Sequence, residues 1–274
     1  MLKWWSILTG GSVRAVRETV KRGRLYGWRA AWTCVCAHGI NFHIRVRNSM
    51  PGQSRVKCPC CGWQGYAYKA FDGGQHIFRQ IECPQCGAHD RHRVLHLFLT
   101  LRLPSFTQKD RCLLLHFAPE KHTQGLLDSH PSISTVATDL QSGALVSFSG
   151  PRFASDIREM GVGDNTFDAV FCIHVLEHVQ EDRQALAEIR RVLKPGGVAV
   201  IMVPGHLGPE THEWGYPDPM FCYHVRDYST HDFARRLEGF LVETVTPDDL
   251  VGVAGRATIQ VPDGAVIFCC TKGS

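Results

Sequence analysis

The stretch from residue 167 to residue 204 restricts the fold of this chain more than any other, and it reads FDAVFCIHVLEHVQEDRQALAEIRRVLKPGGVAVIMVP. Its first part, Phe167–Ile173, is an apolar run typical of a strand buried on both faces. Apolar residues then recur at helical spacing from Arg183, and the Pro-Gly-Gly at 195–197 predicts the end of that helix. Residues 198–203 form a second apolar run. A strand, a helix and a strand in this order predict a parallel sheet with a right-handed crossover.

Both ends of this stretch carry a resemblance to a known family. FDAVFCIHVLEHV followed by LKPGG resembles the fourth and fifth strands of class I S-adenosylmethionine (SAM)-dependent methyltransferases, in the small-molecule branch of type 11. The resemblance implies an α/β fold with a Rossmann-like, seven-stranded class I methyltransferase sheet. The alternative is an unrelated doubly wound domain, which leaves Asp168, the Glu177-His178 pair and the LKPGG motif unexplained.

Two cysteine motifs precede this domain: Cys58-Pro-Cys60-Cys61-Gly62 and Cys83-Pro-Gln-Cys86-Gly87, with 21 residues between Cys61 and Cys83. Thiolates at this spacing can bind zinc from one tight turn, and four of them leave no open coordination position, as in structural zinc sites. The motifs resemble a small N-terminal zinc ribbon with Cys58, Cys61, Cys83 and Cys86 as ligands. A redox CxxC pair is the alternative, and it would not need two copies.

Size and hydropathy set the remaining limits. A chain of 274 residues can bury one large core and one small module. No apolar run approaches the roughly 20 residues that span a bilayer, and the first residues do not make a convincing signal peptide. We therefore expect a cytoplasmic protein without a transmembrane segment, in which twelve cysteines favour metal binding over disulfides.

The N-terminal arm, residues 1–57, is strongly basic. It holds eleven Lys and Arg against one acid, Glu18, whereas the whole chain has a net charge of only +4. Four tryptophans interleave with these charges: Trp4, Trp5, Trp28 and Trp32. The pattern suggests an anionic partner, RNA or a membrane surface, and the alternative is a solvated leader. We expect a helix over 13–26 and a short strand within 32–49.

The first strand of the main domain is predicted at 112–118, followed by the loop HFAPE. The family usually has an acid and several glycines here, and His116 stands where the acid is usual. The loop resembles a variant found in bacterial methyltransferases that also carry an N-terminal CPxCG ribbon. That resemblance implies that Ala118 lies close to SAM, with His116 beside it, and that Glu120 contacts the SAM amino group.

Acids at two further strand ends complete the predicted cofactor site. Asp139 ends the strand predicted at 134–139, where a carboxylate can accept both ribose hydroxyls; the alternative is an N-cap. By the resemblance, Asp156 binds the adenine amino group and Ile157 flanks the ring. The remaining predicted cofactor-binding residues adjoin strand ends in the same way, and they are Leu140, Ile173 and His174.

Histidines supply the candidate bases. His174 follows the strand Phe167–Ile173, at the edge where ligands bind in such sheets. His174 and His178 would share a helical face, and with Glu177 they suggest a metal. We discount that reading because only one further ligand is in sight.

A second candidate base lies in the segment FCYHVRDY, which resembles the family's HVR-x-Y. His224 and Arg226 are two residues apart, so in an extended chain they point the same way. His224 can take a proton, and Arg226 can hold an anionic group of the substrate. The alternative pairs Arg226 with Glu210 or Glu213. Residues 205–220 are expected to form a lid, and residues 246–264 to be irregular.

These observations predict three parts: a basic aromatic arm (1–57), a zinc ribbon (58–90) and a SAM-dependent methyltransferase domain (91–274). The expected reaction moves a methyl group to a hydroxyl, or another nucleophile, of a small molecule or glycan. One alternative is an RNA base methyltransferase, as in ribosomal RNA modification. An alternative of another class is a non-catalytic, zinc-scaffolded binding protein, which the glycine-poor HFAPE loop motivates.

Overall fold

The computed structural model describes residues 13–52, 54–73, 76–106, 111–218 and 222–273. The chain divides into two compact units. Unit 1 comprises Met1–Arg93, Asp218–Tyr223 and Val253–Gln260, and unit 2 comprises Val94–Pro217, His224–Gly252 and Val261–Ser274. Trp4 and Trp5 of the basic arm lie outside the described residues.

A seven-stranded sheet forms the centre of unit 2, with the order β13-β14-β9-β8-β5-β6-β7. Its strands are β5 Cys112–Phe117, β6 Ile133–Asp139, β7 Arg152–Ala154, β8 Phe167–Ile173, β9 Leu193–Met202, β13 Phe240–Val245 and β14 Ile267–Lys272. Strands β5 to β9 pair in parallel, and β14 runs antiparallel to both of its neighbours. The predicted Rossmann-like methyltransferase fold is therefore confirmed.

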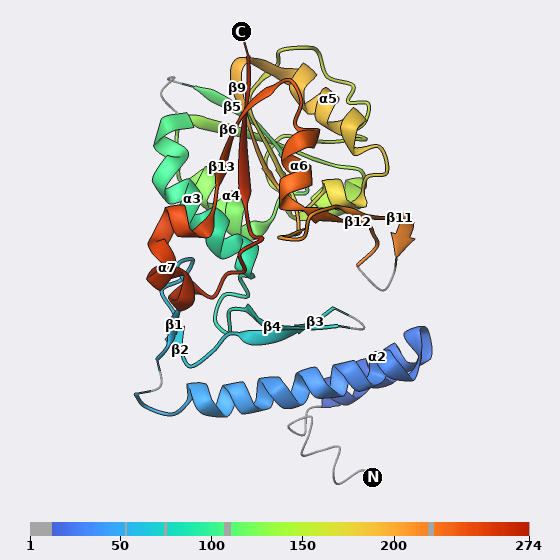
Figure 1. Ribbon diagram of the computed structural model, residues 1–274, viewed down its shortest axis with the longest axis vertical. Helices are drawn as coiled ribbons and strands as arrows, with labels where there is room; N and C mark the ends of the chain where they lie inside the picture. Colours follow the sequence, from blue (N-terminus) through green and yellow to red (C-terminus); the bar gives the residue numbers. More distant parts are fainter. Residues whose placement is uncertain (1–12, 53, 74–75, 107–110, 219–221, 274) are drawn as a thin grey trace. The chain divides into compact units, whose positions relative to one another are not determined.

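Helices cover both faces of this sheet. Figure 1 shows α3 (Asp90–Phe106) and α4 (Lys121–Asp128) on one side, and α5 (Asp182–Val192) and α6 (Thr230–Arg236) on the other. The central strands are apolar because both faces are covered, and Leu115, Val170 and Val200 have no exposed surface. Two short 3₁₀ turns, η1 Ser142–Ser147 and η2 Leu176–His178, follow the ends of β6 and β8.

The structure corrects the predicted helix-to-strand connection at LKPGG. α5 ends at Val192 and β9 begins at Leu193, which pairs with Phe167. The register then shifts, so that Val198 pairs with Ala169. The Pro-Gly-Gly therefore lies in an irregularity within β9 rather than in a loop, and Gly196 takes a φ of 73° there.

Two segments predicted to be irregular contain regular structure. The expected lid holds β10 Gly205–His206 and β11 His212–Asp218, which join β12 His224–Ser229 in a three-stranded sheet of order β10-β12-β11. The 246–264 segment holds α7 (Pro247–Ile259), interrupted at Gly252, whose φ is 67°. This glycine breaks the helical pattern into pieces too short to be recognised in the sequence.

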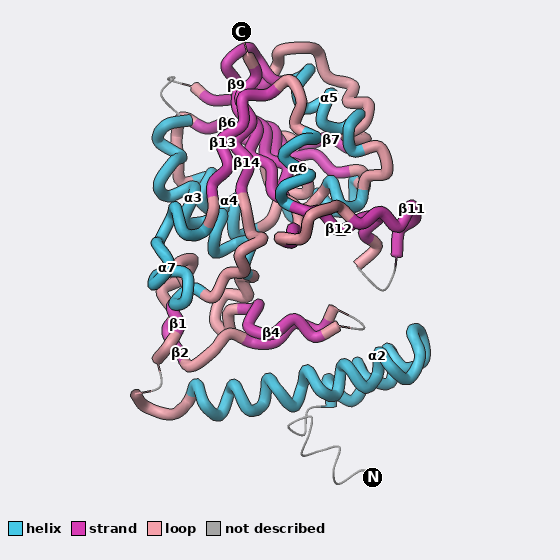
Figure 2. Tube along the Cα trace, viewed as in Figure 1, coloured by secondary structure: helices cyan, strands magenta, loops and turns pink. Residues whose placement is uncertain are grey.

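Unit 1 combines a long helix with two hairpins. α2 (Val13–Asn48) includes the segment where we predicted a short strand, so that expectation was wrong; a break at Gly27 interrupts the helix. The hairpin strands are β1 Val56–Lys57, β2 Gln64–Gly65, β3 Lys69–Asp72 and β4 Ile77–Glu82 (Figure 2). Asn41 of α2 binds both backbone groups of Ala70, which fastens the helix to β3. In the part of the chain that is described, no helix has the length and apolarity needed to cross a bilayer.

Arg93, at the start of α3, is the polar centre of unit 1. Its side chain is fully buried and lies over the ring of Tyr68, 3.8 Å from the centroid. The guanidinium donates hydrogen bonds to backbone carbonyls from three segments, namely Gln80, Ile81, Ala88, Ile259 and Gln260. These carbonyls satisfy a cation that would be costly to bury alone. Burial lowers the pKa of Arg93.

Candidate functional site

A cavity of about 570 Å³ lies at the carboxyl ends of β5, β6 and β8 in unit 2. Parallel strands bring their carboxyl ends to one edge of the sheet, so short segments far apart in the chain meet there. Six of the predicted cofactor-binding residues line this cavity: Ala118, Asp139, Leu140, Asp156, Ile157 and His174.

Three predicted cofactor-binding residues do not line the cavity: His116, Glu120 and Ile173. His116 is buried within β5, where its Nδ1 lies 3.2 Å from Oε1 of Gln124. Burial lowers the pKa of His116 to about 4, so the imidazole is neutral at physiological pH. Glu120 is the N-cap residue of α4, and Ile173 is a buried end residue of β8.

The two acids of the cavity differ in their partners. Oδ1 of Asp139 accepts a hydrogen bond from the backbone N–H of Gln141 at 2.8 Å, which orients the carboxylate. Asp156 forms an ion pair with Arg158, whose Nη2 lies 2.7 Å from Oδ2. Hydrogen bonds from the Arg158 side chain hold the pKa of Asp156 below its usual value. Asp156 is therefore anionic, but part of its hydrogen-bonding capacity is already used.

Two non-glycine residues at the edge of this cavity have left-handed backbone conformations. Ala118 has a φ of 44° and His174 a φ of 53°. Each is held by a backbone hydrogen bond to a neighbouring strand, from Ala118 to Thr138 and from His174 to Met202, both at 2.8 Å. Such conformations cost free energy and concentrate at functional sites. These left-handed residues let the chain turn sharply directly after β5 and β8.

A cluster of histidines with one buried acid lies beside the cavity. His174 and His178 line the cavity, and the ring of His224 meets that of His178 edge-on with centroids 4.8 Å apart. Nδ1 of His174 lies 3.2 Å from Oε1 of Glu177. The structure thus brings both candidate bases, His174 and His224, to the same end of the sheet.

The surroundings of this cluster set its charge. Burial lowers the pKa of His224, which favours a neutral imidazole. Burial alone would raise the pKa of Glu177, but the interaction with His174 and the charge of His178 lower it on balance. The cluster therefore combines a carboxylate with an imidazole that is ready to accept a proton or a cation.

The guanidinium of Arg226 contacts other residues of the protein. Its Nε lies 2.7 Å from Oε2 of Glu213, and its other nitrogens donate to the carbonyls of Val179 and Gln180. The side chain is nearly inaccessible to solvent, and it does not line the cavity. This is the ion pair with Glu213 that we named as the alternative, so direct contact of Arg226 with a substrate stays a prediction.

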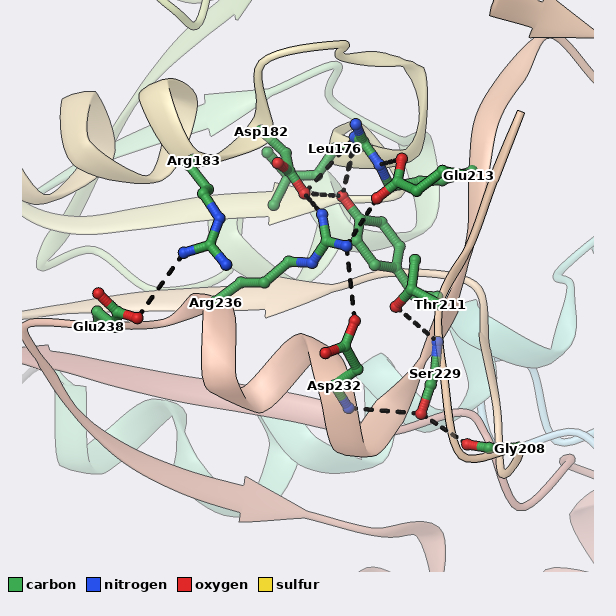
Figure 3. Close-up of polar contacts among 12 residues, drawn as sticks. Leu176, Asp182, Arg183, Gly208, Thr211, Glu213, Ser229, Asp232, Arg236 and Glu238 are labelled. Atoms are coloured by element: carbon green, nitrogen blue, oxygen red, sulfur yellow. Dashed lines mark hydrogen bonds and ion pairs between the residues drawn. The ribbon is translucent and has the colours of Figure 1, made fainter. Parts of the chain in front are cut away.

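Figure 3 shows the network to which this ion pair belongs. Asp182, at the start of α5, and Glu213, on β11, converge on Arg236 of α6. Nη1 of Arg236 is 2.7 Å from Asp182 and Nη2 is 2.7 Å from Glu213. The Tyr228 hydroxyl donates to Asp182 at 2.8 Å. The network fixes β12, and with it the position of His224, relative to the cavity.

The four predicted zinc ligands form a compact cluster in unit 1. The Sγ atoms of Cys58, Cys61, Cys83 and Cys86 all lie within 4.8 Å of one another. The Sγ separations of 3.8 Å, Cys58 to Cys86 and Cys61 to Cys83, match the roughly 3.8 Å that a tetrahedral zinc–thiolate site requires at a Zn–S distance of about 2.3 Å. Both motif glycines have φ near 75°, and their N–H groups donate to the carbonyls of Cys58 and Cys83. The donor set fits zinc.

Cys60 lies outside this cluster. Its Sγ lies 3.6 Å from the carbonyl oxygen of His92, to which the thiol can donate. The cluster therefore contains the four cysteines that we predicted as ligands, and Cys60 is not among them.

Sequence reasoning missed Arg158 and Gln141 as cavity residues. Gln141 lies two residues after Asp139 and Arg158 two residues after Asp156, and each donates a hydrogen bond to that acid. This short spacing in the sequence could have identified both residues. His178 lines the cavity as well, although the sequence alone did not favour it as a metal ligand. Val225 and Pro217 also line the cavity, but they come from strands β12 and β11, which the sequence did not predict here.

The strand order defines a class I methyltransferase fold, and comparison with known proteins agrees. Residues 121–201 match a family described as a methyltransferase domain. Over 118 residues the chain is 31% identical to a protein of Mycolicibacterium smegmatis named "Probable S-adenosylmethionine-dependent methyltransferase"; the match covers 41% of this chain and 43% of that protein. The chain spans less than half the length of the curated relatives it matches.

Solved structures show the same fold at low sequence identity. The CurJ carbon methyltransferase superposes with a TM-score of 0.50 at 16% identity, covering 67% of this chain and 54% of that one. A chain of the complex between the Haloferax volcanii Trm112 methyltransferase activator and a methyltransferase gives 0.50 at 14% identity, covering 67% and 91%. These structures share the fold of this chain, and the family match places a methyltransferase domain over residues 121–201.

Proposed function

We propose that this protein transfers a methyl group from SAM to a hydroxyl group of a small molecule or glycan. One observation carries the proposal: Asp139, Asp156 and the strained turns at Ala118 and His174 all border a single cavity at the ligand edge of a methyltransferase fold. Residues of these types at this edge are suited to a nucleoside cofactor.

Each residue has a proposed task in that cavity. Asp139 accepts the two ribose hydroxyls, Asp156 accepts the adenine amino group, and Leu140 and Ile157 flank the adenine ring. The turn at Ala118 lets the backbone approach the methionine part of the cofactor. His116, Glu120 and Ile173 stand next to cavity-lining residues in the sequence, and we propose that they help to position the cofactor-binding segments.

Bound SAM supplies a methyl group already activated by its sulfonium, so the protein mainly has to position the acceptor and remove its proton. We propose His174 or His224 as the base. Burial holds the pKa of His224 below its usual value, so it is neutral and able to accept a proton at physiological pH. Arg226 orients this region through Glu213, and a direct contact with an anionic acceptor remains part of the proposal.

We also propose that zinc binds the four clustered cysteines of unit 1 and has a structural role. With four thiolates around the ion, no position is open for substrate. The ion would hold the two glycine-containing turns together, and Trp63 and Tyr68 pack beside them.

Calorimetric titration of S-adenosylhomocysteine into the zinc-loaded protein tests the cofactor site. We expect micromolar binding that weakens about 100-fold in Asp139→Ala, because hydrogen bonds to a charged group contribute roughly 1.5–3 kcal/mol each. Asp164→Ala is the matched control, since Asp164 is exposed and precedes the amino end of β8, at the opposite edge of the sheet. No binding by the unmodified protein would overturn the enzyme proposal and favour the non-catalytic scaffold.

RNA is the rival acceptor, and one observation favours it. Trp28 and Trp32 on α2 are 74% and 62% exposed, and the guanidinium of Arg29 lies over the Trp28 ring. Exposed aromatic rings among cations are suited to stacking on bases. Binding of RNA with a steep salt dependence, together with methylation of RNA but not of glycans, would replace the hydroxyl acceptor with a base.

A further inference from the structure

Three potential metal ligands converge beside the cavity of unit 2. Glu177, His178 and His224 each offer one ligand atom, and these atoms all lie within 4.8 Å of one another. Glu177 and His178 belong to η2, directly after β8, whereas His224 opens β12. The ion pairs of Arg226 with Asp182 and Glu213 hold strand β12 in place, and this brings His224 next to Glu177 and His178.

The burial of the Glu177 carboxylate is a second observation at this position. The residue is 1% exposed, and neither of its carboxylate oxygens accepts a well-aligned hydrogen bond from the described residues. Nδ1 of His174 approaches Oε1 to 3.2 Å, whereas Oε2 has no hydrogen-bond partner among the described residues. A buried carboxylate is costly unless it is paired, hydrogen-bonded or bound to a metal. Glu177 is therefore better explained with a cation beside it.

We propose that Glu177, His178 and His224 bind a divalent transition-metal ion such as Zn²⁺ or Co²⁺. Two imidazoles and one carboxylate are a donor set typical of catalytic sites for these ions, and three protein ligands leave a position for an exogenous oxygen. This distinguishes the site from the cysteine cluster, which is closed by four thiolates.

The position of the site gives it a role in catalysis, a part of the inference that rests on the proposed methyltransferase function. His178 lines the same cavity as Asp139, so an ion bound here adjoins the proposed cofactor site. Coordination lowers the pKa of a hydroxyl group, which selects acceptors with an ionisable hydroxyl. His224 would be occupied as a ligand, which leaves His174 as the base.

In the resulting transfer, the hydroxyl proton passes to His174 and the acceptor oxygen forms a bond to the methyl carbon. The bond from that carbon to the sulfonium sulfur breaks, and its electron pair stays on sulfur. The products are a methyl ether, S-adenosylhomocysteine and a proton on His174, so atoms and charge balance without an oxidant or reductant.

Titration of Co²⁺ into the full-length protein with zinc in the cysteine cluster tests the site. We expect one equivalent of Co²⁺ to bind with visible d–d absorption and without the near-ultraviolet charge-transfer bands of thiolate ligands. His224→Ala removes a ligand, and Glu177→Gln replaces a carboxylate with a neutral and weaker oxygen ligand, so each should weaken this binding by about 100-fold or more. His130→Ala is the matched control, since His130 precedes the amino end of β6, at the opposite edge of the sheet.

Several outcomes overturn the site: no second equivalent of metal, thiolate charge-transfer bands, or binding that survives in both variants. Glu177→Gln keeps the size of the side chain, so it decides the question if His224→Ala does not fold. S-adenosylhomocysteine binding is measured on the same samples. Cobalt binding without cofactor binding would keep the metal site and refute the methyltransferase proposal, and the reverse result would refute the metal site alone.

Discussion

Ala118 illustrates how a single residue replaces the glycine-rich loop of related sites. Its φ of 44° is a conformation that favours glycine, yet alanine still leaves the backbone close to the cavity. The HFAPE loop therefore makes its turn after β5 with the smallest side chain that carries a Cβ. This weakens the reason for regarding the chain as a non-catalytic scaffold.

Substitution of Ala118 tests this reading. We expect Ala118→Gly to bind S-adenosylhomocysteine as the unmodified protein does, whereas Ala118→Val should bind at least tenfold more weakly and unfold at lower temperature. A left-handed conformation costs a residue with a Cβ roughly 1–2 kcal/mol, and β-branching adds to this. Calorimetry and thermal unfolding measure the two effects, with Ala144→Val, an exposed position in η1, as control. If Ala118→Val bound S-adenosylhomocysteine as tightly as Ala118→Gly and the unmodified protein do, the backbone at residue 118 would not lie close to the cofactor.

At the scale of elements, buried arginines hold each unit together. Arg226 and Arg236 join α5, α6, β11 and β12 through Asp182 and Glu213 in unit 2. Arg93 joins β4, Ala88 after the second cysteine motif and the end of α7 in unit 1 through hydrogen bonds to backbone carbonyls. In both units these cations connect a helix to several other elements of the same unit.

Arg93→Met should therefore destabilise unit 1 by at least about 3 kcal/mol, because the buried carbonyls around it lose their donors. Arg93→Lys should recover only part of this loss, since an ammonium has fewer donors and no planar fork. Urea unfolding followed by circular dichroism measures the change. Arg79→Met, at an exposed position of β4, should have little effect. A similar loss in both methionine variants would mean that burial of Arg93 is unimportant.

At the scale of the whole molecule, the two units have separate stabilising centres. The cysteine cluster lies in unit 1, and the cavity with its histidines lies in unit 2. Structural zinc contributes on the order of 10 kcal/mol in small zinc-binding domains, so unit 1 should depend on the ion far more than unit 2 does.

Cys86→Ser tests this separation. We expect it to lose one equivalent of zinc and to show a new unfolding transition at lower temperature, while S-adenosylhomocysteine binding stays within about twofold. Cys60→Ser is the matched control, because Cys60 lies in the same motif but outside the cluster. Elemental analysis and scanning calorimetry measure both properties. A Cys60→Ser variant that loses zinc would require a different ligand set.

Much of this architecture could be predicted from local sequence. Apolar runs identified β5, β6, β8 and β9, and the acids that end or follow strands identified Asp139 and Asp156, because a strand and the residue after it are set by neighbours in the chain. The cysteine cluster was predictable for the same reason, since each half of it is a single turn. The pieces of α7 and β11 were not, because Gly252 and the aromatic, proline-containing segment around Trp214 obscure the periodicity.

The sequence by itself therefore determined the parallel sheet, the edge of the sheet where the cavity lies and the four clustered thiolates. Only the tertiary structure brought His224 next to Glu177 and His178, and paired Arg226 with Glu213. These contacts join residues separated by long stretches of chain, and they depend on where β12 packs. Local periodicity carries no information about such long-range packing, so the third ligand that we could not find in the sequence became visible only in the fold.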